Sequence, residues 1–207
     1  QELIDSALSD FNKNLDCCFI VADNSIKSYQ SLSKEYSAIE PPTWALLLAE
    51  SMRSVNYSVS IIDANAEKLS REQVHQRIVK LNPRLICFVV YGQNVNAGTT
   101  NMSGAIYLSN YLKNKDVDIP LTIIGSHVQA LPKETLEKES SINFVFTNEG
   151  VYSLRNVLRI KKFDPESLSR VKGIAYRNDK KIIINESEKV VPNNRMDIDL
   201  PGYAWDL

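Results

Sequence analysis

The chain alternates short, strongly apolar runs with longer segments in which apolar residues recur every three or four positions. The first pattern is typical of strands buried on both faces of a sheet, and the second is typical of helices with one buried face. Strands are predicted at residues 17–22, 57–62, 85–90, 121–124 and 142–146, and helices at 42–55, 70–81, 102–112, 132–138 and 151–160. This alternation predicts an α/β fold, a Rossmann-like, doubly wound sheet of five parallel strands with right-handed crossovers.

Three residues support the predicted helix starts. Pro42 suits the first turn of a helix, where its missing N–H is not needed. Ser70 and Gln73 have the spacing of a capping box, in which each side chain bonds the other residue's backbone N–H. We therefore expect helices to begin close to Pro42 and Ser70.

The pattern changes after Phe163. Residues 173–177 and 181–185 are β-forming runs on either side of Asn178-Asp179-Lys180, which predicts a β-hairpin. The tail is rich in Pro, Asn and Asp and is expected to be an extended linker. The predicted organisation is an N-terminal extension at 1–14, an α/β domain at 15–163, a hairpin appendage at 164–191 and a linker at 192–207.

Composition narrows the possible partners. The net charge of -1 over 207 residues gives no basis for attraction to nucleic acid or to an anionic membrane. No apolar run approaches the roughly 20 residues that span a bilayer, and the N-terminus does not resemble a signal peptide. The three cysteines, Cys17, Cys18 and Cys87, all fall in predicted strands and are expected to be buried free thiols, which fits a cytoplasmic protein.

Polar and glycine-containing turns follow the predicted strands. The carboxyl ends of parallel strands meet at one edge of the sheet, where open α/β sheets bind their ligands. Glycine allows a close approach of the backbone, and exposed N–H groups at helix starts attract anions. The predicted ligand-binding residues are Asp23, Asn24, Tyr91, Gly92, Gln93, Asn94, Gly125, Ser126, His127, Asn148, Glu149 and Gly150.

Motifs for catalysis are missing from the sequence. It has no P-loop, no Gly-x-Gly-x-x-Gly after the first strand, no Cys-x-x-Cys or His-Glu-x-x-His metal motif and no Gly-x-Ser-x-Gly elbow. Tyr91 stands where a receiver domain would carry its phosphate-accepting Asp. We therefore predict no catalytic residue and no metal ligand, and we interpret His127 as lining a ligand pocket.

Several short segments occur in an order shared with one known family. They are Pro41-Pro42 with 46–49, then 57–64, 83–88, Ile124-Gly125-Ser126-His127 with Pro132, Asn148-Glu149-Gly150, 173–177, and finally 197–201 with 204–207. Taken together, they resemble the N-terminal cobalamin-binding domain of cobalamin-dependent radical SAM proteins. The resemblance covers roughly residues 15 to 207.

The resemblance implies that cobalamin (vitamin B12) is the cofactor, with its nucleotide tail near Gly125 and Asn148 and its corrin beside the loop that starts at Tyr91. It implies a radical SAM domain of the same chain as partner, located beyond Leu207, which would hold the 4Fe-4S cluster and S-adenosylmethionine. The full-length protein would transfer methyl groups or perform related radical chemistry, and this segment alone would be inactive.

This sequence departs from the family pattern at two glycines and lacks a further motif. Ser126 replaces the second Gly of the Gly-Gly-x-His turn, and Asn148 replaces the first Gly of the Gly-Glu-Gly turn. The Asp-x-His-x-x-Gly motif of other cobalamin domains is absent, so the resemblance implies no histidine ligand to cobalt. Two alternatives remain from the sequence: a ligand-free docking domain of the same fold, or the nucleotide-sugar-binding half of a glycosyltransferase.

Overall fold

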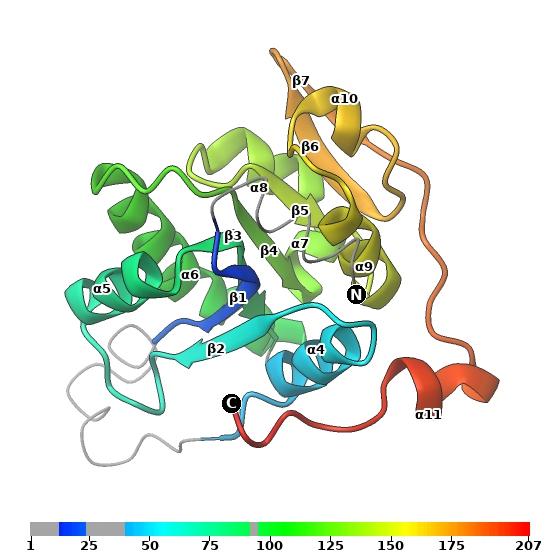
Figure 1. The fold of residues 1–207 in the computed structure, drawn as a ribbon. Coiled ribbons are helices and arrows are strands. Elements are labelled where there is room, and N and C mark those ends of the chain that lie inside the picture. The colour runs from blue at the N-terminus through cyan, green and yellow to red at the C-terminus, as the bar shows by residue number, and fades with distance from the viewer. Residues whose placement is uncertain (1–12, 24–39, 92–94) are drawn as a thin grey trace.

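A computed structural model describes residues 13–23, 40–91 and 95–207 (Figure 1). Its sheet has the strand order β2-β1-β3-β4-β5-β6-β7, in which the first five strands are parallel and the last two are antiparallel. The strands are β1 (Leu15–Val21), β2 (Val59–Asp63), β3 (Pro83–Val90), β4 (Leu121–Gly125), β5 (Phe144–Phe146), β6 (Ile174–Asn178) and β7 (Lys181–Ile184). The predicted α/β class and the five parallel strands are confirmed.

Helices cover both faces of the sheet. One hydrophobic core lies under α4 and α9, and the other lies under α5, α6, α7 and α8 (Figure 1). The helices are α4 (Thr43–Arg53), α5 (Arg71–Leu81), α6 (Val95–Asn114), α7 (Ser126–Ala130), α8 (Pro132–Lys138), α9 (Val151–Arg159), α10 (Pro165–Leu168) and α11 (Met196–Asp199), with a 3-10 turn, η2 (Asn193–Arg195). The structure is therefore doubly wound, as the alternation of strands and helices predicts.

Central strand β3 shows why the run from Leu85 to Val90 is continuously apolar. All eight of its residues are buried. Leu85, Cys87 and Val89 belong to the core under α4 and α9. Ile86, Phe88 and Val90 belong to the opposite core. Alternate side chains of a strand point to opposite faces, so a strand covered on both sides favours apolar residues throughout. The charged residue of β3, Arg84, is buried and donates a hydrogen bond to Asp16 Oδ1 at 3.1 Å.

The cysteines and the capping box are found as predicted. Cys17, Cys18 and Cys87 are free and fully buried. The Ser70 hydroxyl accepts the Gln73 N–H at 3.2 Å, and the Gln73 side chain accepts the Ser70 N–H at 2.8 Å. These reciprocal bonds fix the start of α5.

Helix α6 begins seven residues earlier than the sequence predicts, at Val95 instead of Met102. The segment contains Gly98, Thr99, Thr100 and Asn101, residue types with low helix propensity. Packing overrides this propensity, because the first turns of α6 lie against the turn after β4. A side chain at Gly98 would place its Cβ 2.1 Å from Ser126 Oγ.

The hairpin β6–β7 extends the main sheet and is not a separate appendage. Phe144 pairs with Tyr176 and Phe146 pairs with Ile174, so β6 covers the free edge of β5. The sheet consequently has seven strands instead of five. An unpaired edge on buried β5 would leave backbone groups without partners, which explains why the hairpin docks there.

Residues 186–207 form a C-terminal strap that passes α9 and α4 (Figure 1, orange to red). The strap is partly helical, whereas the sequence predicted an extended linker. Val191 and Ala204 are buried in the core under α4 and α9. The Ala204 N–H donates to the Leu46 carbonyl at 3.3 Å, so the strap is packed against the domain.

Candidate functional site

Strand β1 lies between β2 and β3. The connection from β1 leads to β2 on one side, and the next strand, β3, lies on the other side of β1. Such a switch in strand order opens a crevice at the carboxyl edge, which is where α/β sheets of this order bind ligands. Asp23 follows β1 and Tyr91 follows β3 at this crevice. The other predicted residues of these two loops, Asn24, Gly92, Gln93 and Asn94, lie outside the described residues.

Tyr91 is fixed from two sides. Its ring stacks on that of Trp44, with centroids 4.8 Å apart and an interplanar angle of 23°. Its hydroxyl accepts a hydrogen bond from Gln129 Nε2 at 2.6 Å. Burial raises the pKa of the Tyr91 phenol well above its ordinary value, so the hydroxyl stays protonated. The pair of rings gives this edge a rigid, largely apolar wall.

Sequence reasoning missed Trp44 and Gln129. Trp44 is the second residue of α4, and the start of α4 lies at the carboxyl edge because the helix runs back from β1. Gln129 lies on the short helix α7, where it also donates to the Asn148 carbonyl at 2.8 Å. Trp44 comes two residues after Pro42, the predicted first-turn proline. This position alone could have indicated that Trp44 lies at the start of the helix and at the carboxyl edge of the sheet.

Packing within the sheet gives Gly125 its own reason to lack a side chain, and the approach of a ligand at Gly125 stays a prediction. A Cβ at this position would lie 2.1 Å from the carbonyl oxygen of Val90. Val90 is the β3 residue paired with Gly125. Close packing between β3 and β4 therefore requires the glycine, whether or not a ligand lies nearby.

Ser126 and His127 face α6. Ser126 Oγ is buried, and among the described residues it has no hydrogen-bond partner. His127 Nδ1 lies 3.1 Å from Thr99 Oγ1, and both residues line an open groove of about 530 Å³ between α6 and α8. A buried hydroxyl without a partner is costly, which marks Ser126 as a position that a polar ligand could satisfy.

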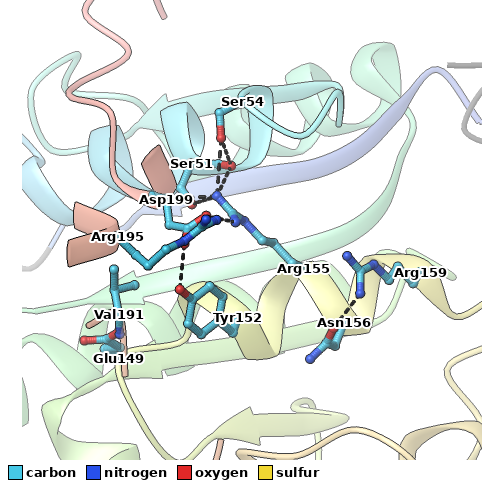
Figure 2. Close-up of polar contacts among 10 residues, drawn as sticks. All are labelled: Ser51, Ser54, Glu149, Tyr152, Arg155, Asn156, Arg159, Val191, Arg195 and Asp199. Atoms are coloured by element: carbon cyan, nitrogen blue, oxygen red, sulfur yellow. Dashed lines mark hydrogen bonds and ion pairs between the residues drawn. The ribbon is translucent and has the colours of Figure 1, made fainter. Parts of the chain in front are cut away.

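The turn after β5 is held by the strap. Asn148 Oδ1 accepts the Gly150 N–H at 2.9 Å, and Asn148 Nδ2 donates to the Glu188 carbonyl at 3.2 Å. Glu149 Oε1 accepts the Val191 N–H at 2.6 Å (Figure 2). Gly150 has φ +87°, a left-handed conformation that favours glycine. The polar side chains predicted to contact a ligand are therefore bonded within the protein.

A buried polar network joins the strap to α9 and α4 (Figure 2). Asp199 Oδ1 accepts from Arg155 Nη1 at 2.7 Å, and Asp199 Oδ2 accepts from the Tyr152 hydroxyl at 2.6 Å and Arg195 Nε at 2.9 Å. Hydrogen bonds from Arg195, Tyr152 and Arg155 hold the pKa of the Asp199 carboxyl well below its ordinary value. Arg155 also donates to the Ser51 hydroxyl at 2.9 Å, so one guanidinium connects three elements.

Within the described part of the chain, no cluster of three His, Cys, Asp or Glu residues could hold a metal ion. Across the same residues, no helix is both long and apolar enough to cross a membrane.

Comparison with known proteins identifies the family. The model of the B12 binding domain matches residues 32–158, which is more than half of the chain. The chain belongs to the B12-binding domain family. The strand order and the carboxyl-edge crevice described above are consistent with this assignment.

Two curated relatives are each 25% identical to the chain. One is an uncharacterized methyltransferase of Pyrococcus horikoshii, aligned over 163 residues, 79% of this chain and 33% of the relative. The other is the anaerobic magnesium-protoporphyrin IX monomethyl ester cyclase of Rubrivivax gelatinosus, aligned over 188 residues, 86% of this chain and 32% of the relative. The chain thus spans about a third of the length of these relatives.

Two solved structures share the fold. The radical S-adenosylmethionine methyltransferase TsrM from Kitasatospora setae matches with a TM-score of 0.60 and 13% identity, over 84% of this chain and 30% of that protein. The cobalamin-dependent S-adenosylmethionine radical enzyme OxsB matches with a TM-score of 0.53 and 17% identity, over 95% of this chain and 26% of that protein.

Proposed function

We propose that this chain binds cobalamin at the carboxyl edge of its sheet, as the B12-binding part of a longer radical SAM protein. Membership of the B12-binding domain family carries the proposal. TsrM and OxsB, which share the fold, are both described as S-adenosylmethionine radical proteins, and OxsB as cobalamin-dependent. We propose methyl transfer or related radical chemistry for the whole protein.

The residues present fit a large ligand with both apolar and polar groups. Tyr91 and Trp44 offer stacked rings beside the strand ends. Ser126 offers a buried hydroxyl that no described residue bonds. When bound, cobalamin supplies the cobalt centre for radical and group-transfer chemistry, and the protein supplies binding and orientation. In this proposal the rings exclude water and Ser126 makes a hydrogen bond that orients the ligand.

His127 is proposed to line the cofactor's surroundings and not to ligate cobalt. Its Nδ1 lies beside the Thr99 hydroxyl, which directs this side of the ring toward α6. The missing Asp-x-His-x-x-Gly motif agrees with this placement. The 4Fe-4S cluster and S-adenosylmethionine are proposed to bind in another domain of the longer protein.

The test uses hydroxocobalamin and the visible spectrum of the desalted protein. We expect the 207-residue chain to retain corrin at micromolar concentration. Ser126→Ala should weaken binding about tenfold, equivalent to about 1.4 kcal/mol, because the ligand loses one hydrogen bond. Thermal stability of the free variant should be unchanged or higher, since a buried hydroxyl that no described residue bonds is removed.

Ser109→Ala is the matched control. Ser109 Oγ is buried and lies 2.8 Å from Ser141 Oγ. Its loss should lower stability without changing cobalamin affinity. A chain that elutes free of corrin after desalting would refute the proposed function.

One observation favours the ligand-free docking domain as a second candidate. The side chains of Asn148 and Glu149 are bonded to the strap and are not free for a ligand. Retention of corrin separates this candidate from the first. The family match favours cobalamin over the glycosyltransferase alternative.

A further inference from the structure

A single nitrogen atom joins two loops at the carboxyl edge of the sheet. Gln129 Nε2 donates to the Tyr91 hydroxyl at 2.6 Å and to the Asn148 carbonyl at 2.8 Å. Tyr91 follows β3, Asn148 follows β5, and Gln129 belongs to α7, which follows β4. Gln129 therefore connects the ends of three neighbouring strands at the proposed cofactor site.

The two partners determine how the Gln129 amide is oriented. A backbone carbonyl oxygen can only accept a hydrogen bond, so the amide atom that faces Asn148 must be the nitrogen and not the oxygen. An amide nitrogen can only donate, and it carries two hydrogens, one for each partner. The Tyr91 hydroxyl oxygen must consequently be the acceptor in its contact with Gln129.

This arrangement leaves the hydroxyl proton of Tyr91 available. Among the described residues, no group accepts a hydrogen bond from the Tyr91 hydroxyl. Burial, and to a smaller extent the Glu149 carboxylate, raise the pKa of the Tyr91 phenol well above its ordinary value, so the proton is retained at physiological pH. The ring of Trp44 stacks on that of Tyr91 and limits its movement. An oriented donor of this kind in a crevice is a group that a ligand can satisfy.

We infer that Gln129 is a positioning residue, which directs the hydroxyl proton of Tyr91 toward an acceptor oxygen of the bound cofactor. This inference rests on the proposed function, in which the cofactor is cobalamin. Cobalamin presents acceptor oxygens in the amide groups around its corrin and in its nucleotide tail. Gln129 itself does not contact the cofactor and acts through Tyr91.

The test reverses the polarity of the Gln129–Tyr91 contact with almost no change in size. Gln129→Glu introduces a carboxylate, which can only accept, so the Tyr91 proton would turn toward position 129 and away from the cofactor. Gln129→Met, of similar length and without donors, is a second variant in case the first does not fold. Gln76→Glu is the matched control, because Gln76 is exposed on α5. Equilibrium dialysis of the full-length protein against hydroxocobalamin gives each dissociation constant.

Gln129→Glu should weaken cobalamin binding on the order of tenfold, and Tyr91→Phe should weaken it by a similar factor. In the Tyr91→Phe background, Gln129→Glu should change affinity by less than about twofold, because the proton that it redirects is gone. Gln129→Met should weaken binding about threefold, again only where Tyr91 is present. Urea midpoints should fall in both backgrounds, since the Asn148 carbonyl loses its donor.

This split between affinity and stability distinguishes positioning from simple support of the fold. Equal losses of affinity in both backgrounds would mean that Gln129 only supports the turn after β5, and would overturn the inference. Unchanged affinity in Gln129→Glu, or an equal loss in Gln76→Glu, would overturn it too. Unchanged affinity in Tyr91→Phe would overturn it even if neither variant at position 129 folds.

The wild-type protein, measured in the same dialysis, separates this inference from the proposed function. Cobalamin bound to the wild type, together with equal losses in both backgrounds, refutes the positioning role alone and leaves the proposed function standing. A folded wild-type protein that takes up no cobalamin refutes both.

Discussion

Glu149 at the carboxyl end of β5 accepts the backbone N–H of Val191 at 2.6 Å, across 42 residues of sequence. Glu149 belongs to the turn predicted to contact the ligand, and Val191 belongs to the strap. The bond therefore ties the edge of the sheet to the segment that crosses α9 and α4. Any rearrangement of the turn after β5 must also break or move this contact.

Glu149→Ala should lower the free energy of unfolding by about 1 to 3 kcal/mol, because the Val191 N–H loses a charged acceptor. Urea denaturation measures this change. Glu137→Ala is the control, since Glu137 is exposed and pairs with Lys133 on the same helix. If both variants have the same urea midpoint, the Glu149–Val191 bond does not stabilise the strap.

Asp199 should contribute to stability at neutral pH and lose that contribution in acid. Its pKa is well below the ordinary value in the folded protein, mainly because of Arg195 and Tyr152. The unfolded chain titrates at about 3.9, so the unfolded state binds more protons between the two pKa values and stability rises with pH there. The contribution is complete above about pH 5 and is lost progressively as the pH falls.

Urea midpoints of the wild-type chain and Asp199→Asn, measured between about pH 2 and pH 7, check this expectation. The variant should be less stable at neutral pH, because Arg155 is left buried without its carboxylate partner. The difference should shrink toward low pH. A constant difference across the whole range would mean that the charge of Asp199 does not stabilise the fold.

Gly98 and Ser126 should show strong coupling. Gly98→Ala alone should destabilise the protein by about 1 to 3 kcal/mol, because its Cβ would lie 2.1 Å from Ser126 Oγ. In the Ser126→Ala background the added Cβ would lie 3.5 Å from the Cβ of residue 126, which is ordinary packing. There Gly98→Ala should stabilise α6 by up to about 1 kcal/mol through helix propensity.

A double-mutant cycle measured by thermal unfolding gives this coupling. Gly125→Ala is the comparison, because its clash is with the Val90 carbonyl and not with a removable hydroxyl. Ser126→Ala should not rescue it. Additive effects of Gly98→Ala and Ser126→Ala would show that the first turns of α6 move away from β4 freely.

His127→Ala should leave the visible spectrum of bound cobalamin unchanged and weaken affinity only modestly. His127 Nδ1 is beside Thr99, and the histidine lines the groove between α6 and α8. Spectral titration with hydroxocobalamin measures both quantities. Loss of a nitrogen-ligated spectrum in His127→Ala would show that this histidine reaches cobalt and would contradict the proposed placement.

Periodicity predicted the sheet because both faces of its central strands are buried. The eight residues of β3 are all apolar or buried, and no surface position interrupts the pattern. The early start of α6 was not predictable from propensity, since Gly98 and its threonine neighbours favour turns. That helix start depends on close contact with Ser126, a residue 28 positions later.

The sequence predicted where in the fold the candidate site lies better than it predicted what each side chain of the site contacts. The turns after β4 and β5 were located correctly at the edge of the sheet. The sequence could not indicate that Asn148 and Glu149 bond the strap, because their partners lie 40 and 42 residues away. Trp44 and Gln129 reach Tyr91 through tertiary packing, which no local pattern encodes.

The buried Arg155 network also bears on the order in which the parts of the domain can come together. Arg155 bonds Ser51, 104 residues earlier in the chain, and Asp199, 44 residues later. During synthesis from the N-terminus, all seven strands and α9 exist before Asp199 is made. The guanidinium must stay hydrated until α11 arrives, since an unpaired charge is not buried without large cost. We therefore expect the strap to dock late in folding, so that a nascent chain interrupted before Asp199 would carry its sheet beneath an open α4–α9 surface.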